Sequence, residues 1–346
     1  MNDNQRIGLA DIIKGIAVLL MIQVHVMELF ATQDLYESTQ GSISLFLGSI
    51  PAAPIFMLLM GYFLAFSKKS TSEMALRGVR LFLGGLLLNI GLNLHLLYKI
   101  VFENWAFNPL HSVLGADILT LAGLSLVCFA MIKKILTNKY YLYFGLAATI
   151  ALLSQFTQPN QFEDHSLRYL LAFLVGGTSW SYFPLIPWLS FPLLGFGCKL
   201  MNDKFDLDAA AKKWWSKIIF VILLCVLAFT IDFSNSISNN LAEYYHFKFL
   251  FFLWSVAFII VWIYALYFIE KRAEKTMIVH FLQFLGKNVT SVYVFQWLII
   301  GNLATVLYKS QSFGQWAIWV LVITISASAL AYFWVKFRIK KDAQRI

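Results

Sequence analysis

The chain has 346 residues, of which 60% are hydrophobic and only 13% are charged, and its mean hydropathy is +0.71. A soluble globular domain carries about 25% charged residues, so this composition excludes one and predicts a polytopic membrane protein. The net charge of +9 is explained by membrane topology and by contact with anionic lipid of the bilayer, and it requires no nucleic acid as a partner.

Long apolar runs recur from one end of the chain to the other. Because a membrane-spanning helix needs about 20 apolar residues, these runs predict about ten spans. They lie at residues 9–31, 43–66, 81–101, 114–132, 140–157, 183–201, 217–233, 248–269, 289–308 and 315–336. The predicted fold is an all-α transmembrane helix bundle that occupies residues 1–346 as a single domain.

The basic residues divide unequally between the two sides of these spans. Ten spans put both termini on one side, and with cytoplasmic termini only Lys99, Arg168, Lys248 and Lys309 fall outside. The other 23 of the 27 basic residues then lie on the inner side. Since Lys and Arg concentrate in cytoplasmic loops, this division predicts an N-in, C-in orientation.

The first span carries four ionisable residues on one helical face, namely Asp11, Lys14, His25 and Glu28. Lys14 and His25 are eleven positions apart, so on an α-helix they point the same way to within about 20°. Asp11 and Glu28 flank them at a spacing of three residues, which keeps them on that face. Charges at membrane depth are costly and usually mark function, so this stripe is the leading candidate site.

The two ends of the stripe suggest different roles. His25 lies about 16 Å along the helix from Lys14, near or beyond mid-membrane, with Lys14 near the cytoplasmic face. A neutral imidazole can take a proton from a hydroxyl or amine, and Glu28 could orient it or raise its basicity. Two alternatives stay open: a histidine that only bonds a neighbouring helix, and an Asp11–Lys14 ion pair at the membrane boundary.

Other basic residues could extend the cytoplasmic end of this site. Arg77 and Arg80 open the third predicted span from the same side as Lys14. Together the three could form a basic mouth for an anionic cofactor. Topology alone explains the two arginines equally well.

Polar residues within later spans complete the candidate set. Asn89 lies in the third span and Gln296 in the ninth, where either could simply bond helices together. Asp117 lies early in the fourth span, on the outer side. An unpaired carboxylate there would be costly, so Asp117 is the stronger functional candidate. By contrast, Cys128, Cys198 and Cys225 show no CxxC spacing and predict neither a disulfide framework nor a metal site.

Several blocks of the sequence resemble the transmembrane acyltransferase superfamily. LADIIKGIAVLLMIQVH (9–25) is similar to the opening of the acyltransferase-3 family, in which a basic residue, ten intervening residues and a histidine recur. Lys14 stands where arginine is usual. Later blocks resemble heparan-α-glucosaminide N-acetyltransferase and its bacterial relatives, namely RGVRLFLGGLLLN (77–89), ADILTLAGLSL (116–126), FPLIPWLSFPLLGFG (183–197) and LGKNVTSVYVFQW (285–297).

One departure from this resemblance bears on the catalytic residue. Heparan-α-glucosaminide N-acetyltransferase, a lysosomal enzyme, has a histidine in the outer loop after its first span. The corresponding residues 32–42 of this chain contain no histidine. His25 is therefore the best candidate for a catalytic histidine.

The resemblance implies a bundle that takes acetyl-CoA from the cytoplasm and passes the acetyl group to a sugar or glycan outside. His25, as general base, would act with Glu28 and Asp117, and the cofactor would contact Lys14, Asp11, Arg77, Arg80, Asn89 and Gln296. The resemblance also implies that the protein lies in the cytoplasmic membrane of a bacterium. The acceptor, the acyl length, an acyl-histidine intermediate and a homodimer are all left open.

Two other functions fit the same residues. A line of Asp, Lys, His and Glu side chains is also typical of the proton path in a proton- or ion-coupled carrier. Buried polar groups also hold helices together in assembly proteins without any activity of their own. Turnover of acetyl-CoA would distinguish an acyltransferase from a carrier and from an assembly protein.

Overall fold

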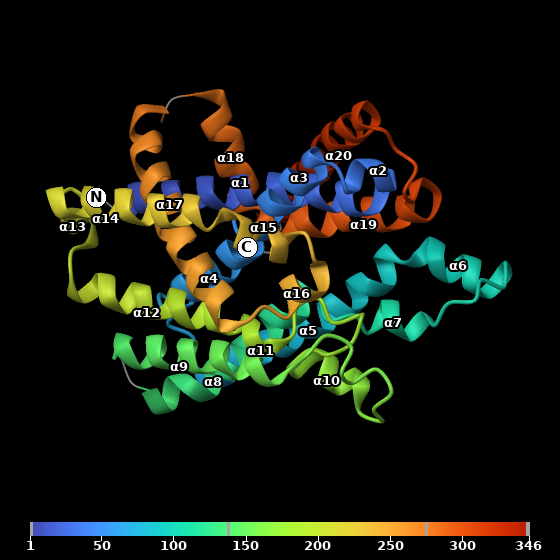
Figure 1. The fold of residues 1–346 in the computed structure, drawn as a ribbon, viewed down its shortest axis with the longest axis horizontal. Coiled ribbons are helices and arrows are strands. Elements are labelled where there is room, and N and C mark those ends of the chain that lie inside the picture. Colours follow the sequence, from blue (N-terminus) through green and yellow to red (C-terminus); the bar gives the residue numbers. More distant parts are fainter. Residues whose placement is uncertain (1–2, 137–138, 274–275, 344–346) are drawn as a thin grey trace. The chain divides into compact units, whose positions relative to one another are not determined.

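The computed structural model describes residues 3–136, 139–273 and 276–343. Within these ranges every regular element is a helix, and the strand-like contacts are two isolated β-bridges, Ala31 with Gln311 and Ala116 with Ser181. Apolar helices recur along the chain (Figure 1). The predicted all-α, polytopic membrane fold is therefore confirmed.

Seven helical segments among the described residues are long and apolar enough to cross a membrane. An eighth crossing results if α14 (Trp214–Phe229) and α15 (Ile231–Ser238), bent by 59°, form one span. The seven are Gly8–Phe30, Thr39–Leu64, Thr71–Leu92, Ile118–Leu136, Phe249–Glu270, Val289–Leu307 and Phe313–Lys340. The predicted spans 140–157 and 183–201 coincide with the shorter α9 (Tyr140–Leu153) and α12 (Ser190–Lys204). The count of ten and the orientation stay predictions.

Contacts between residues divide the chain into two compact units. Unit 1 comprises residues 1–52, 90–107 and 266–346, and unit 2 comprises residues 53–89 and 108–265. Two helices, α5 (Thr71–Leu92) and α17 (Phe249–Ala273), contribute residues to both. The prediction of a single domain over 1–346 stays a prediction.

Unit 1 is built around its first helix. It contains α1 (Asp3–Phe30), α2 (Gln33–Tyr36), α3 (Thr39–Ser49), α6 (Leu94–Phe102), α18 (Met277–Lys287), α19 (Val289–Leu307) and α20 (Phe313–Ala343). In this unit α1 packs against α3, α18, α19 and α20 (Figure 1). The helix with the charged stripe is therefore surrounded by other helices over much of its length.

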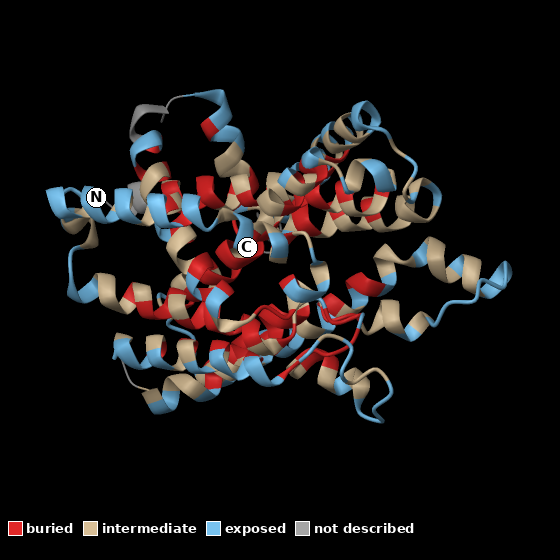
Figure 2. Cartoon of the chain, in the orientation of Figure 1, coloured by how far each residue is buried: buried red, intermediate tan, exposed pale blue. Residues whose placement is uncertain are grey.

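Unit 2 has its core between α12, α4 (Ala53–Leu64) and α9. A Cβ atom at Gly61 would lie 1.9 Å from the carbonyl oxygen of Pro192, so the backbones of α4 and α12 are in direct contact there. Buried residues, red in Figure 2, gather along these two helices and α11 (Leu185–Trp188). Unit 2 also contains α14, α15 and most of α5 and α17, together with α7 (Pro109–Val113), α8 (Ile118–Leu136), η1 (Ser154–Phe156), α10 (Arg168–Leu174), α13 (Leu207–Ala211) and α16 (Leu241–Tyr245).

The helix predicted at 81–101 begins ten residues earlier than expected, at Thr71. Ser70 and Glu73 form a reciprocal capping box: the Glu73 N–H donates to Ser70 Oγ (3.2 Å) and the Ser70 N–H donates to Glu73 Oε2 (2.8 Å). This cap fixes the start of α5. Arg77 and Arg80 therefore lie inside the helix, and the prediction that they open it was wrong.

The amphipathic helix α18 was not predicted. It lies between the predicted spans 248–269 and 289–308 and is too short to cross a membrane. Its buried residues include Leu285 and Gly286, and it packs along α1. The Asp11–Lys14 end of the stripe is thus covered by a helix from near the other end of the chain.

Candidate functional site

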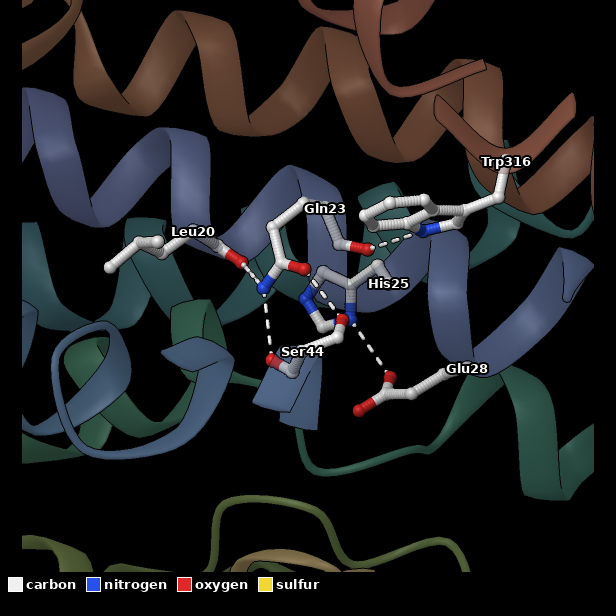
Figure 3. A network of polar contacts seen from close by, with 6 residues as sticks. All are labelled: Leu20, Gln23, His25, Glu28, Ser44 and Trp316. Carbon is white, nitrogen blue, oxygen red and sulfur yellow. Dashed lines mark hydrogen bonds and ion pairs between the residues drawn. The ribbon is translucent and has the colours of Figure 1, made fainter. Parts of the chain in front are cut away.

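His25 and Glu28 contact one another on α1. The Nδ1 atom of His25 lies 3.0 Å from Oε2 of Glu28, and their side chains are 12% and 14% exposed. Figure 3 shows the ring and the carboxylate turned toward each other. The expected contact between Glu28 and the imidazole is therefore present.

This contact determines which ring nitrogen of a neutral His25 carries the hydrogen. An ionised carboxylate can only accept a hydrogen bond, so Nδ1 is the donor and carries the hydrogen. The lone pair then lies on Nε2, and no other residue among those described forms a hydrogen bond with the ring. The arrangement has the form of a general base with an orienting carboxylate.

A polar network beside His25 joins α1 to two other helices of unit 1. The side-chain amide of Gln23 donates to the carbonyl oxygens of Leu20 (2.9 Å) and Ser44 (3.0 Å), and the Ser44 hydroxyl donates to Gln23 Oε1 (2.5 Å). The indole of Trp316 donates to the Gln23 carbonyl (3.3 Å). Figure 3 shows these contacts around His25. They hold the backbone of α1 against α3 and α20 at this depth.

Trp297 of α19 lies against the catalytic candidate. Its ring centroid is 4.3 Å from that of His25, at an interplanar angle of 43°. Its indole N–H is shielded from solvent and has no hydrogen-bond acceptor among the described residues. Trp297 was not predicted as a site residue, although it ends the block 285–297.

Gln296, which was predicted, precedes Trp297 and is fully buried. Both polar atoms of its side chain lack a hydrogen-bond partner among the described residues. Buried polar groups are normally bonded, so two such exceptions at consecutive residues of α19 are unusual.

Near the C-terminal end of α1, the charge of Glu28 acts on Tyr36 of α2. Burial, followed by the charge of Glu28, raises the pKa of Tyr36 to about 12. The Nζ atom of Lys309 lies 3.8 Å from the centre of the Tyr36 ring. The phenol therefore stays protonated at neutral pH.

At the other end of the stripe, Lys14 and Asp11 form an ion pair. Lys14 Nζ is 2.6 Å from Asp11 Oδ1, and the Asp11 side chain is only 4% exposed. A Cβ at Gly286 of α18 would lie 1.9 Å from the Asp11 carbonyl oxygen, so the backbones touch. The Asp11–Lys14 ion pair, which the sequence allowed as an alternative, is therefore present. A role of these two residues in cofactor binding stays a prediction.

In unit 2, Asp117 lies directly before α8 and caps it. Its Oδ1 accepts the Thr120 N–H at 2.8 Å, whereas Oδ2 is shielded from solvent with no hydrogen-bond partner among the described residues. Burial raises the pKa of this carboxyl to about 6. The prediction that Asp117 lies within the span was wrong, because an aspartate that caps a helix must precede it.

Asn89, the other polar candidate of unit 2, holds the segment before Asp117. Its amide donates to the carbonyl oxygens of Gly115 (2.9 Å) and Val113 (3.3 Å). Its observed contacts thus position the loop that leads to Asp117.

Arg77 and Arg80, the two basic candidates of unit 2, are exposed on α5.

The candidates therefore fall into two sets. Unit 1 holds Asp11, Lys14, His25, Glu28 and Gln296, and unit 2 holds Arg77, Arg80, Asn89 and Asp117. Direct cooperation between the two sets stays a prediction. In the described part of the chain, no group of three or more His, Cys, Asp or Glu residues could hold a metal ion.

The sequence matches the family model described as an acyltransferase domain over residues 9–335, which is nearly the whole chain. The chain belongs to the acyltransferase-3 family. No curated protein and no solved structure matches it.

Membership of the acyltransferase-3 family establishes an integral membrane acyltransferase, with an acyl donor and an acceptor as its substrates. The match begins at residue 9 and so includes the whole stripe from Asp11 to Glu28. It favours acyl transfer over the carrier and the assembly protein that the same residues allowed.

Proposed function

We propose that this protein transfers an acetyl group from cytoplasmic acetyl-CoA to an amine or hydroxyl of a sugar or glycan at the outer face of the membrane. The observation that carries the proposal is the 3.0 Å contact between His25 Nδ1 and Glu28 Oε2. It favours the ring tautomer whose Nε2 can accept a proton. His25 acts as general base on the acceptor, and Glu28 orients the ring and stabilises the imidazolium.

The charge distribution along α1 supports a direction for the reaction. Lys14 lies about three helical turns from His25, toward the end that the positive-inside rule assigns to the cytoplasm. Lys14 contacts a phosphate of CoA, and the pantetheine arm extends toward His25. Asp11 holds Lys14 in place, and Gln296 and Asn89 bond polar groups of the donor.

Asp117 assists at the acceptor. Its unbonded Oδ2 is available to accept a hydrogen bond from an acceptor hydroxyl or amine. With the predicted N-in orientation it lies on the outer side of a bacterial cytoplasmic membrane, where glycan acceptors occur.

The experiment is release of CoASH by purified protein in lipid nanodiscs, with acetyl-CoA and a panel of amino sugars and neutral sugars. Wild-type protein is expected to release CoASH only when a suitable acceptor is present, and His25→Ala should abolish this at an unchanged melting temperature. His280→Gln, which alters an exposed histidine of α18, is the matched control and should retain full activity. Accumulation of a solute in vesicles without CoASH release would contradict the proposal.

A further inference from the structure

The indole N–H of Trp297 and the side-chain amide of Gln296 are the least explained polar groups of unit 1. Both residues lie on α19, and three of their polar atoms are shielded from solvent without a hydrogen-bond partner in the described residues. A donor left unbonded inside a protein costs free energy, and a ligand carbonyl beside it would supply the missing acceptor. The ring of Trp297 contacts His25, at a centroid distance of 4.3 Å.

We infer that Trp297 is a catalytic residue that donates its indole N–H to the carbonyl oxygen of the acyl donor, beside the base His25. This inference rests on the proposed function and adds to it the group that stabilises the oxyanion. The ligand class is therefore a thioester whose carbonyl oxygen enters this buried position.

The chemical step accounts for both groups. The acceptor oxygen or nitrogen forms a bond to the thioester carbon while its proton passes to Nε2 of His25. The carbonyl π pair moves to oxygen, and Trp297 N–H bonds the resulting oxyanion. The carbonyl then re-forms, the carbon–sulfur bond breaks, and the thiolate takes the proton from Nε2 to leave as CoASH.

Because the rings of His25 and Trp297 are in contact, one can accept the proton while the other bonds the oxyanion. Two hydrogen bonds of about 2.8 Å can reach atoms on one tetrahedral carbon from rings that touch. The face of an indole also stabilises an adjacent cation, and His25 becomes an imidazolium during the step. The N–H and the ring face therefore act on opposite charges of the same transition state.

Trp297→Phe separates these contributions, because it keeps an aromatic ring against His25 and removes the N–H together with part of the ring volume. Loss of one oxyanion donor is expected to lower kcat about 100-fold. The KM for acetyl-CoA should rise about tenfold, because the same N–H also bonds the carbonyl oxygen of the bound donor before the reaction. The lost ring volume should lower the melting temperature no more than the same substitution does at another shielded tryptophan.

Trp262 provides the matched control in unit 2. Its indole N–H is also shielded and without an acceptor in the described residues, and its ring stacks on Phe258 at 5.8 Å. Trp262→Phe should leave both kcat and KM unchanged. A kcat for Trp297→Phe within threefold of wild type would overturn the assignment, as would a loss of activity accompanied by a larger fall in melting temperature than that of Trp262→Phe.

A binding measurement tests the same contact without turnover. The probes are the acetyl-CoA analogue in which a methylene replaces the thioester sulfur, which keeps the carbonyl, and S-ethyl-CoA, which lacks it. Wild-type protein should bind the ketone about tenfold more tightly, and Trp297→Phe should bind both equally. A preference retained by Trp297→Phe would overturn the inference and leave the proposed function standing, whereas wild-type protein that neither binds nor turns over acetyl-CoA would overturn both.

Discussion

The Nδ1 atom of His25 and the Oε2 atom of Glu28 lie 3.0 Å apart, about one turn from each other on α1. This contact needs no other part of the chain, because residues three apart on a helix are neighbours. What unit 1 adds is burial: both side chains are less than 15% exposed, so their hydrogen bond is shielded from competing water.

Glu28→Gln should lower kcat by about 100-fold, because an amide can also donate a hydrogen bond and no longer holds the hydrogen on Nδ1. The measurement is CoASH release at saturating acetyl-CoA. Glu37→Gln is the control, since Glu37 is exposed after α2 and accepts a hydrogen bond from Gln33. Equal rates in the two variants would refute an orienting role for Glu28.

The charged stripe could be predicted from sequence because it is local. The pairs Asp11–Lys14 and His25–Glu28 each lie within one helix, so spacing alone brings their side chains together. The membrane class could be predicted for a similar reason, since apolar length is a property of each segment by itself.

The contact of Trp297 with His25 could not be predicted, because it depends on how α19 packs against α1. The signal available was the unusual density of polar residues in the block that ends at Trp297. The helix α18 was missed because its apolar face is short and covers another helix rather than lipid. Asp117 was placed inside a span because its neighbours are apolar, whereas its bond to the Thr120 N–H makes it a cap.

A pair of substitutions tests whether Lys14 binds the cofactor or has a structural role alone. Lys14→Met removes the ion pair of a buried carboxylate and should destabilise the protein by about 3 kcal/mol. Lys14→Met combined with Asp11→Asn removes both charges and should restore most of that stability. Unfolding in detergent gives the free energies.

The same variants are then compared in acetyl-CoA kinetics. If Lys14 contacts a CoA phosphate, both the single and the double variant should raise the KM for acetyl-CoA at least tenfold with little change in kcat. A double variant with a wild-type KM would assign Lys14 a structural role alone.

Gly286→Ala should separate α18 from α1. The added Cβ would lie 1.9 Å from the Asp11 carbonyl oxygen, which is backbone and cannot rotate away. Overpacking of this kind costs about 1–3 kcal/mol, so the melting temperature should fall. Gly84→Ala in α5 is the control: nothing lies within 4 Å of its Cβ, and it should stabilise the helix by about 0.5–1 kcal/mol. A Gly286→Ala protein as stable as wild type would show that α18 does not depend on this contact.

His246 of unit 2 provides a test of pH dependence outside the candidate site. Its Nε2 accepts the Gly177 N–H (3.0 Å), and its Nδ1–H donates to the Ala242 carbonyl (2.9 Å), so the ring is neutral. The ring supports a loop in which Gly176 and Gly177 have φ angles of +80° and +76°, a conformation that favours glycine. Burial, and to a smaller extent the charge of Lys248, lowers the pKa of His246 below its ordinary value of 6.5.

Because the histidine pKa is lowered in the folded protein, its contribution to stability is present above pH 6.5 and is lost as the pH falls through the folded pKa. His246→Gln keeps one acceptor and one donor but does not titrate. Its melting temperature should therefore depend less on pH between about 5 and 7 than that of wild type. His165→Gln, at an exposed histidine of the same unit, should keep the wild-type pH dependence. An unchanged slope in His246→Gln would show that this histidine does not control the acid sensitivity of unit 2.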